Sequence, residues 1–471
     1  MTSRSVRWSF AGLLFVYTVL MFAMACRRFQ VFAHDTGDIA FYDNVFWWTT
    51  RGGRPFFSTL ADYNTFGQHS AFFLVLLTPF YWLVPGPNTL ALLQTVCLTL
   101  SAIPVFLIAR RAIGDERQAV WLAMTYLLLP GIGAQNVNQF EEPCFVPIFL
   151  MWAFYFFLEE RFGMFLLLGA LTCLVRENAP LAVAMFGVYA LMVRRTWKWV
   201  VTPLLGAGVY FVLVIEVIMP WLREGHRWHC MEMFHYLGRT PGEIVSNAVA
   251  HPIAVIQNLC SLRNARLLFF LLVPMLLLPL LSPASVVALP DLAIFLGADF
   301  PVVKTIQYHY HVTSSAALFV GTILALPKVA RWFGGGPSLK RLTNLMLLLT
   351  LAAAPVWIRP KEYIPRPNQA ALEHALKAVP AGHSVIVPLR LVSRVSQRPH
   401  FANITVLTNR PEYAAQFEYI LLDTREERYP QAVQPGWNDA EYEQVFAENG
   451  VYVYRRRAGE GDWKYRPEWI R

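Results

Sequence analysis

Ionisable side chains are concentrated in a polar stretch, residues 34–70, between the first two apolar segments of the chain. Group transfer to a hydroxyl needs one carboxylate that takes the hydroxyl proton while the new bond forms. The adjacent Trp47 and Trp48 are of a type that favours the headgroup level of a bilayer. The stretch therefore indicates a reactive site at a membrane surface, or alternatively a solvated loop whose acids cap short helices. Its acids and histidines are His34, Asp35, Asp38, Asp43, Asp62 and His69.

A second charged pair, Arg176 and Glu177, interrupts a run of apolar residues. A charge at membrane depth costs roughly 2.5 to 3.5 kcal/mol on insertion scales, so such residues usually face a cavity or each other. The forked guanidinium of Arg176 suits a phosphate group, which predicts an anion site. The alternative is a pair at the outer water boundary that neutralises itself.

Further polar groups are candidates for the same site. Glu141 and Glu142 are expected to bind an acceptor or, with an Asp, to act as oxygen ligands for Mg or Mn, unless they only cap a helix or face solvent. His69 is expected to orient a phosphate or a base, or to be satisfied by backbone groups. The segment 308–311 alternates Tyr and His, so an extended chain places both histidines on one face. This segment is a candidate for sugar or phosphate contacts, with an interfacial aromatic belt as the alternative.

Several patterns exclude other kinds of site. The histidine spacing in residues 226–235 is not that of a helical zinc site, so we do not expect metal there. The six cysteines lack CxxC spacing and lie mostly in or beside apolar segments, which indicates packing rather than zinc ligands or disulfides. No GxGxxG or P-loop pattern is present, so no nucleotide cofactor is indicated. A transferase that works outside the cell without nucleotides needs an activated substrate attached to a lipid.

The composition places the chain among polytopic membrane proteins. Of its 471 residues, 56% are hydrophobic and 15% are charged, and the mean hydropathy is +0.40. The net charge of +9 is compatible with nucleic-acid binding, but the basic residues lie largely in short loops beside apolar segments, which is the positive-inside pattern. We therefore expect the lipid bilayer, and not nucleic acid, as a partner. Residues 8–25 follow Arg4 and Arg7 without a cleavage site, which predicts a retained anchor and a cytoplasmic N-terminus.

Alternating apolar segments and basic loops predict an α-helical polytopic membrane domain over residues 1–357. The segment 71–84 is short for a crossing and is expected to be interfacial or re-entrant. The remaining segments amount to about ten or eleven transmembrane helices. They are 8–25, 89–109, 119–132, 145–158, 162–174, 179–193, 200–220, 267–281, 286–296, 312–326 and 345–356.

The same charge bias assigns the loops to the two faces of the membrane. Loops that hold basic clusters are expected in the cytoplasm, and the long polar loops outside it. Two details oppose the rule, because Arg27 and Arg28 fall just outside the first crossing whereas Glu159 and Glu160 fall inside. The predicted outer loops are 31–70, 133–143 and 221–266.

Residues 358–471 have the composition of a soluble protein, and about 110 residues suffice for a small domain. The parity of the crossings places this domain outside the cytoplasm. Apolar patterns predict that it is an α/β domain. The predicted helices are 370–378 and 439–448, and the predicted strands are 384–387, 419–422 and 451–454.

The order of short motifs along the chain resembles that of the GT-C superfamily of polytopic glycosyltransferases. It resembles more closely the prokaryotic family labelled domain of unknown function twenty seventy-nine. The resemblance runs from the first crossing to about Leu326. The motifs that carry it are Asp35–Asp43 with Gly52-Gly53, Phe66–His69, Ala109–Arg111, Phe140–Pro143, Arg176–Asn178, Tyr236–Glu243 and Gln307–Tyr310.

This resemblance implies an inverting transferase of the inner (plasma) membrane that moves a sugar from a polyprenyl-phosphate donor to an acceptor on the extracytoplasmic face. By its spacing to a following Tyr and Gly, Asp38 matches the general base of such enzymes, with Asp35 as the second candidate. An adjacent Asp-Glu pair is usual there, whereas Ile39 follows Asp38. No cofactor is certain, and a divalent cation, Mg or Mn, is left open. The residues expected around the donor phosphate are Arg176, His69 and His309, and those expected to bind acceptor or metal are Glu141, Glu142, Glu177 and Tyr308.

Two other functions are compatible with the sequence. A transporter or flippase for a lipid-linked or anionic solute would line its path with Arg176 and Glu177, but the half-chain repeats that support such a function are not seen. A catalytically inactive GT-C-like scaffold would bind lipid or partner proteins instead. Release of free polyprenyl phosphate separates sugar transfer from transport.

Overall fold

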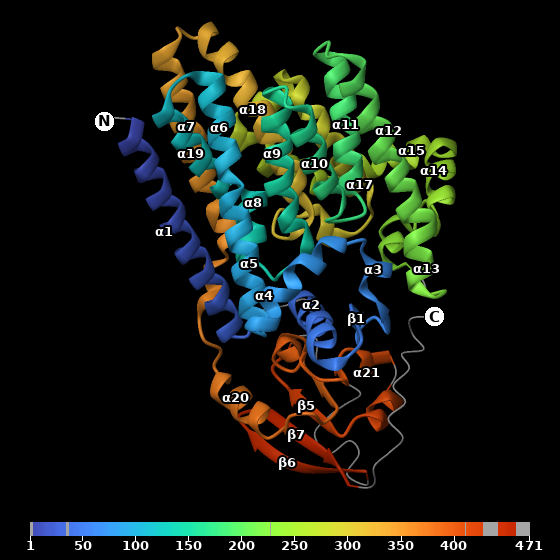
Figure 1. Ribbon diagram of the computed structural model, residues 1–471. Coiled ribbons are helices and arrows are strands. Elements are labelled where there is room, and N and C mark those ends of the chain that lie inside the picture. The colour runs from blue at the N-terminus through green and yellow to red at the C-terminus, as the bar shows by residue number, and fades with distance from the viewer. Residues whose placement is uncertain (1–2, 34–36, 227, 410, 427–440, 458–471) are drawn as a thin grey trace.

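A bundle of helices forms most of the protein, and a small β-sheet lies beyond one end of the bundle (Figure 1). The computed structural model describes residues 3–33, 37–226, 228–409, 411–426 and 441–457. The helices of the bundle are α1 (Ser3–Gln30), α2 (Asp38–Trp47), α3 (Thr65–Gln68), α4 (Thr78–Leu83), α5 (Pro87–Leu100), α6 (Ala102–Ile113), α7 (Glu116–Leu128), α8 (Pro130–Val137), α9 (Val146–Leu158), α10 (Phe162–Cys173), α11 (Ala179–Met192), α12 (Trp197–Leu213), α13 (Met219–Arg223), α14 (Pro241–Ala250), α15 (Pro252–Leu259), α16 (Leu262–Leu272), α17 (Leu289–Gly297), α18 (Val312–Trp332) and α19 (Gly336–Ile358).

Apolar helices confirm the predicted helical membrane fold. Five of the described helical segments are long and apolar enough to cross a bilayer, and five shorter apolar helices accompany them. The long segments are Arg4–Gln30, Pro87–Ile113, Trp197–Arg223, His309–Trp332 and Gly336–Ile358. The shorter ones are Phe72–Leu83, Glu142–Leu158, Phe162–Cys173, Ala179–Met192 and Pro283–Gly297.

Two predicted crossings are not continuous helices. Within 119–132, α7 ends at Leu128, because the residue before Pro130 takes an extended ψ of 141° and a second helix, α8, begins at that proline. Within 267–281, α16 ends at Leu272 and is followed by 3-10 turns that contain prolines. Prolines that interrupt the helical hydrogen bonds therefore shorten both segments.

Helix α18 lies at the centre of the bundle. In the segment His309–Trp332, 83% of the most apolar window is buried by the protein itself, against 17% for the peripheral segment Trp197–Arg223. Helix α18 packs so closely on its neighbours that two positions accept only glycine: a Cβ at Gly131 would lie 2.0 Å from the Ser315 oxygen, and a Cβ at Gly321 would lie 2.0 Å from the Ser285 oxygen. This tight packing fixes the position of α18, which begins three residues after His309.

The two exceptions to the charge rule are explained by buried or paired side chains. Arg28 lies within α1 and is fully buried, and its guanidinium donates to the Val137 carbonyl at 2.6 Å and forms an ion pair with Glu362. At the other end of the bundle, Glu159 and Glu160 form ion pairs with arginines of neighbouring turns. Partners in the fold therefore neutralise these charges, and the sequence alone does not reveal the partners.

The predicted loop 221–266 is mostly helical, which differs from the long polar loop expected. Helices α14 and α15 each begin with a proline in the first turn, a position where the missing backbone N–H costs nothing. The side chain of Thr240 caps α14 by accepting from the Glu243 backbone N–H, and Ser261 caps α16 in the same way. These capping signals were present in the sequence of the segment.

The C-terminal region holds a five-stranded sheet with strand order β4-β3-β5-β7-β6. Strand β3 pairs in parallel with β4 and β5, whereas β7 pairs antiparallel with β5 and β6. The region consists of α20 (Gln369–Lys377), β3 (Val385–Val387), β4 (Phe401–Asn403), α21 (Val406–Asn409), β5 (Tyr419–Asp423), β6 (Tyr442–Glu448) and β7 (Val451–Arg456), and a separate hairpin of β1 (Phe57–Ser58) and β2 (Tyr63–Asn64) precedes α3.

Most of the C-terminal prediction is confirmed, but the helix predicted over 439–448 is wrong. The described part of that stretch is strand β6, which pairs with β7 through a turn at Asn449 and Gly450. Both turn residues have positive φ, 46° and 81°, and this pair of residues is the strongest short signal for a two-residue hairpin. The hairpin pairing overrides the helical preference of the acidic residues.

Helix α2 is held between the bundle and the C-terminal region (Figure 1). The buried Asp43 carboxylate accepts hydrogen bonds from the Ser396 hydroxyl at 2.6 Å and the Tyr81 hydroxyl at 2.7 Å. Its neighbour Asn44 donates to the Ser396 carbonyl at 2.8 Å. Contacts with α4 and with the C-terminal region therefore fix the orientation of α2, the helix that begins with Asp38.

Candidate active site

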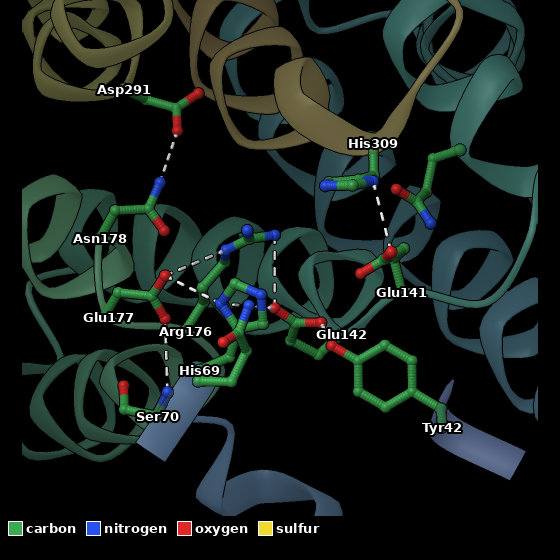
Figure 2. A network of polar contacts seen from close by, with 12 residues as sticks. Tyr42, His69, Ser70, Glu141, Glu142, Arg176, Glu177, Asn178, Asp291 and His309 are labelled. Atoms are coloured by element: carbon green, nitrogen blue, oxygen red, sulfur yellow. Dashed lines mark hydrogen bonds and ion pairs between the residues drawn. The ribbon is translucent and has the colours of Figure 1, made fainter. Parts of the chain in front are cut away.

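Segments that are distant in the sequence bring the candidate residues together at the end of the bundle nearest the sheet (Figures 1 and 2). Prolines in the first turns of the apolar helices mark where those helices begin, because proline is favoured in the first turn of a helix, and the polar residues lie just before these starts. The residues are Asp38 and Tyr42 of α2, His69 after α3, Glu141 and Glu142 before α9, Arg176 and Glu177 between α10 and α11, and His309 before α18.

A buried ion network surrounds Arg176 (Figure 2). The guanidinium lies 3.3 Å from a Glu142 oxygen and 3.6 Å from a Glu177 oxygen. The His69 Nδ1 atom lies 3.0 Å from Glu177 and 3.9 Å from Glu142. The side chains of Arg176, Glu142 and Glu177 are only 8%, 1% and 9% exposed, so water screens these charges little. Two cationic or protonatable groups therefore face two carboxylates in a closed space.

The pKa of Glu177 shows the strength of this environment. Burial alone would raise the pKa of this carboxyl, but the charge and hydrogen bond of His69 and the charge of Arg176 lower the pKa to about 2. The Ser70 backbone N–H also donates to the second carboxylate oxygen at 3.3 Å. Glu177 is therefore ionised in the folded protein and holds His69 beside Arg176.

Tyr42 connects α2 to the same network. Its hydroxyl donates a hydrogen bond to the Glu142 carboxylate. Burial, followed by the negative charges of Glu142 and Glu141, raises the pKa of the Tyr42 hydroxyl well above its usual value, so the group stays a neutral donor. This contact fixes α2 relative to Arg176.

A second group of ionisable atoms lies beside the network. Asp38, Glu141 and His309 each offer a ligand atom within 4.8 Å of the other two, and Glu141 lies 3.7 Å from the His309 Nδ1 atom. Burial, followed by the charges of Asp38 and Glu142, raises the pKa of Glu141 well above its usual value. The two adjacent glutamates therefore belong to different groups: Glu142 faces Arg176, and Glu141 faces Asp38.

The second group fits a divalent cation. Two carboxylates and one imidazole at this spacing supply the oxygen and nitrogen ligands that Mn²⁺ accepts, whereas Mg²⁺ prefers oxygen alone. A bound cation would also offset the mutual repulsion that raises the pKa of Glu141. A further group, His69, Glu177 and Cys230, also lies within 4.8 Å, but there His69 and Glu177 already pair with each other and with Arg176. Cys230 is the one described residue of the 226–235 stretch in either group.

The space between these side chains is small. A cavity of about 10 Å³ is lined in part by Arg176, Asn178, Asp291 and His309, and it holds roughly one water molecule. This cavity is too small for a sugar phosphate.

One predicted site residue lies outside the described residues, and the Tyr-His segment does not have the extended conformation that was considered for it. Asp35, the second candidate base, lies outside the described residues. Residues 309–311 form a 3-10 turn, so the arrangement considered for an extended chain, with both histidines on one face, does not apply. The ring of His311 is buried, with Nε2 2.7 Å from the Val303 carbonyl, and the Tyr308 ring lies 6.0 Å from the Arg359 guanidinium. Within the Tyr-His segment, His309 lies beside Glu141, with its Nδ1 atom 3.7 Å from a Glu141 oxygen.

Three polar residues of the site were not predicted from the sequence. Asp291 lies within an apolar helix and accepts hydrogen bonds from the Asn178 amide at 2.9 Å and from Ser314. The argument used for Arg176 applies equally to an acid in the apolar run 286–296, so a signal was present for Asp291. Asn178 and Tyr42 gave no such signal, because their roles depend on the tertiary contacts.

The DUF2079 family, described as a predicted membrane protein, matches residues 28–453. The chain belongs to this family. It is similar in structure to ArnT from Cupriavidus metallidurans bound to undecaprenyl phosphate, at 12% sequence identity and a TM-score of 0.56, over 96% of this chain and 98% of that chain. The apo structure of the same ArnT gives 12% identity, a TM-score of 0.54, and coverage of 93% and 98%. No match was found among curated proteins. At this identity the likeness shows the fold alone, which is GT-C-like.

Proposed function

We propose that this DUF2079 protein is an inverting glycosyltransferase that moves a sugar from a polyprenyl-phosphate donor to an acceptor. The observation that supports the proposal is that two groups of ionisable side chains lie on either side of the adjacent Glu141 and Glu142. The buried cation Arg176 lies on one side, and Asp38 lies with His309 on the other. A fold similar to that of an ArnT that binds undecaprenyl phosphate supports a donor of the same class.

The proposed reaction uses these groups in separate roles. The acceptor hydroxyl oxygen attacks the anomeric carbon, the Asp38 carboxylate takes the hydroxyl proton, and the bond from that carbon to the phosphate oxygen breaks. The electron pair of this bond stays on the polyprenyl phosphate, and Arg176 with His69 would stabilise its negative charge. Attack opposite the leaving group inverts the configuration of the sugar.

Opening of the network is part of this proposal. Arg176 is occupied by Glu142 and Glu177 in the closed arrangement, and the donor phosphate would replace one carboxylate as its partner. Glu141 and His309, with one carboxylate oxygen of Asp38, would hold a divalent cation that supplies additional positive charge near the phosphate, and the second Asp38 oxygen would take the proton. Glu177 would keep His69 oriented toward the leaving group.

We also propose that the site faces the extracytoplasmic side of the inner membrane. The N-terminal end of α1 lies at the end of the bundle away from the sheet (Figure 1). The basic residues at the end of α6, Arg110 and Arg111, support a cytoplasmic position for that end. Residues 358–471 would then form an extracytoplasmic domain that helps to bind the acceptor.

The test is a transfer assay in membranes with radiolabelled undecaprenyl-phosphate hexoses and pentoses as donors. Asp38→Asn removes the base and is expected to lower transfer by about 10²- to 10⁴-fold, the usual contribution of a general base. Asp115→Asn is the matched control, because Asp115 caps α7 at the opposite end of the bundle and Asn caps a helix equally well. Transfer by Asp38→Asn at the wild-type rate would exclude the proposed role.

A further inference from the structure

A second, larger cavity lies outside the candidate active site. Its volume is about 260 Å³, close to the lower end of ligand pockets at about 300 Å³. It is formed by α16, the 3-10 turn Pro301–Lys304, the residues that follow this turn, and the end of α19. The lining residues are Arg263, Arg266, Leu267, Phe270, Pro301, Lys304, Thr305, Ile306, Gln307 and Val356.

The cavity is strongly cationic. Arg263, Arg266 and Lys304 line it, and no lining residue carries a negative charge. Within the described part of the chain, none of the three cations lies within ion-pair distance of a carboxylate. Burial lowers the pKa of the Lys304 ammonium, and the nearby positive charge of Arg263 lowers it further, whereas the negative charge of Asp299 raises it. An anion in the cavity would relieve this repulsion.

The polar lining can hold an anion in a defined place. The buried Lys304 ammonium donates to Asn258, which fixes the position of its charge. Thr305 and Gln307 add neutral polar groups beside it. The Gln307 side-chain amide donates to the Val356 carbonyl at 3.3 Å, and the Gln307 backbone carbonyl accepts from the Asn138 amide at 2.6 Å. The cavity wall is therefore tied to the core of the bundle.

The apolar surroundings identify the source of the anion. On α16, Leu262 and Phe269 are 85% and 56% exposed and frame the two arginines along the helix. Exposed apolar side chains next to arginines are typical of a segment at the headgroup level of a bilayer, where the charged ends reach the interface. The cavity is at the same end of the bundle as His309, because Gln307 lies two residues before it.

We propose that this cationic cavity binds the phosphate group of an anionic membrane lipid, and that it is a site separate from Arg176. Arg263 and Arg266 would contact the phosphate from the open side, and Lys304 from the buried side. The phosphate would accept charge-assisted hydrogen bonds from all three groups. The proposal does not depend on sugar transfer, since it concerns binding alone.

The experiment measures lipid binding to the purified, delipidated full-length protein by native mass spectrometry. The probes are phosphatidylglycerol, phosphatidylcholine and, as a competitor, inorganic phosphate. We expect the wild type to prefer phosphatidylglycerol, and Arg263→Gln with Arg266→Gln to weaken that binding at least tenfold. Arg239→Gln is the control, because Arg239 is an exposed cation in the same 221–266 segment that does not line the cavity.

Each outcome decides the proposal. Competition by millimolar inorganic phosphate supports binding of the phosphate group itself, and lack of competition would overturn the assignment of the phosphate group as the bound anion. Unchanged binding in the double variant, or an equal loss in Arg239→Gln, overturns the proposal. Both arginines are exposed, so the single variants provide a second measurement if the double variant does not fold, with a loss of at least threefold expected for each.

Discussion

Removal of the Arg176 charge is expected to destabilise the protein strongly. Arg176→Gln would leave two buried carboxylates, those of Glu142 and Glu177, without the cation that lies 3.3 and 3.6 Å away. Removing one partner of a buried pair costs about 3 to 5 kcal/mol, because the remaining charge is left uncompensated. His69 remains beside Glu177, so the cost is expected to fall mainly on Glu142.

A double variant separates this cost from a general loss of packing. Arg176→Gln with Glu142→Gln removes the uncompensated charge, so we expect it to recover about half or more of the free energy of unfolding that Arg176→Gln loses. The matched control is Arg195→Gln, since Arg195 pairs with Glu160, whose side chain is 67% exposed. Breaking such a surface pair costs about 0 to 1 kcal/mol.

The free energies are measured by reversible unfolding with sodium dodecyl sulfate in mixed micelles. A loss in Arg176→Gln no larger than that in Arg195→Gln would refute the reasoning. So would a double variant that is less stable than Arg176→Gln, because the two buried groups would then contribute independently. Either result would mean that the ion network around Arg176 is hydrated or open.

The remaining predictions concern protons and metal. The pKa of Glu177 is about 2 in the folded protein against 4.5 normally. This difference stabilises the folded state by about 3 kcal/mol above pH 4.5, and the stabilisation is lost as the pH falls toward 2. Glu177→Gln should reduce this acid sensitivity when the free energy of unfolding is measured across that range. Burial raises the pKa of Asp43 from 3.8 to about 6, although hydrogen bonds from Ser396 and Tyr81 oppose this shift. The free energy of unfolding should therefore fall by about 3 kcal/mol as the pH rises from 3.8 to 6. Asp43→Asn should remove this dependence of stability on pH. Glu232 is an exposed carboxylate outside both groups of possible ligands, so Glu232→Gln is the control for metal binding. Calorimetric titration with Mn²⁺ should show at least tenfold weaker binding to Glu141→Gln than to Glu232→Gln, and equal binding would exclude Glu141 as a ligand.

The amino-acid pattern predicts the helical membrane body and much of the C-terminal region because burial and propensity are local there. Strands β3, β5 and β7 are short apolar runs, and each was predicted within two residues of its observed ends. Strand β6 was not predicted, because its acidic residues favour a helix. Its pairing with β7 through the turn at Asn449-Gly450 stabilises the strand instead. Local preference fails where a partner strand supplies the stabilisation.

The candidate site is predictable in part for the same reason. Arg176 stands out because a charge among apolar residues is costly, and its neighbours Glu142 and His69 stand out by type and motif. Their mutual contacts depend on the packing of α10 against α9 and of α2 against the C-terminal region, which no local pattern encodes. The pairing of Arg28 with Glu362 is a further contact of this kind, between residues 334 positions apart.

The most direct measurement of the central claim is the release of free polyprenyl phosphate by the purified protein. With an undecaprenyl-phosphate sugar as donor, the account predicts that one molecule of undecaprenyl phosphate is released for each sugar transferred, and that Asp38→Asn abolishes both while Asp115→Asn changes neither. Movement of the intact donor across a bilayer without release, or release that is equal in Asp38→Asn and the wild type, would contradict the account.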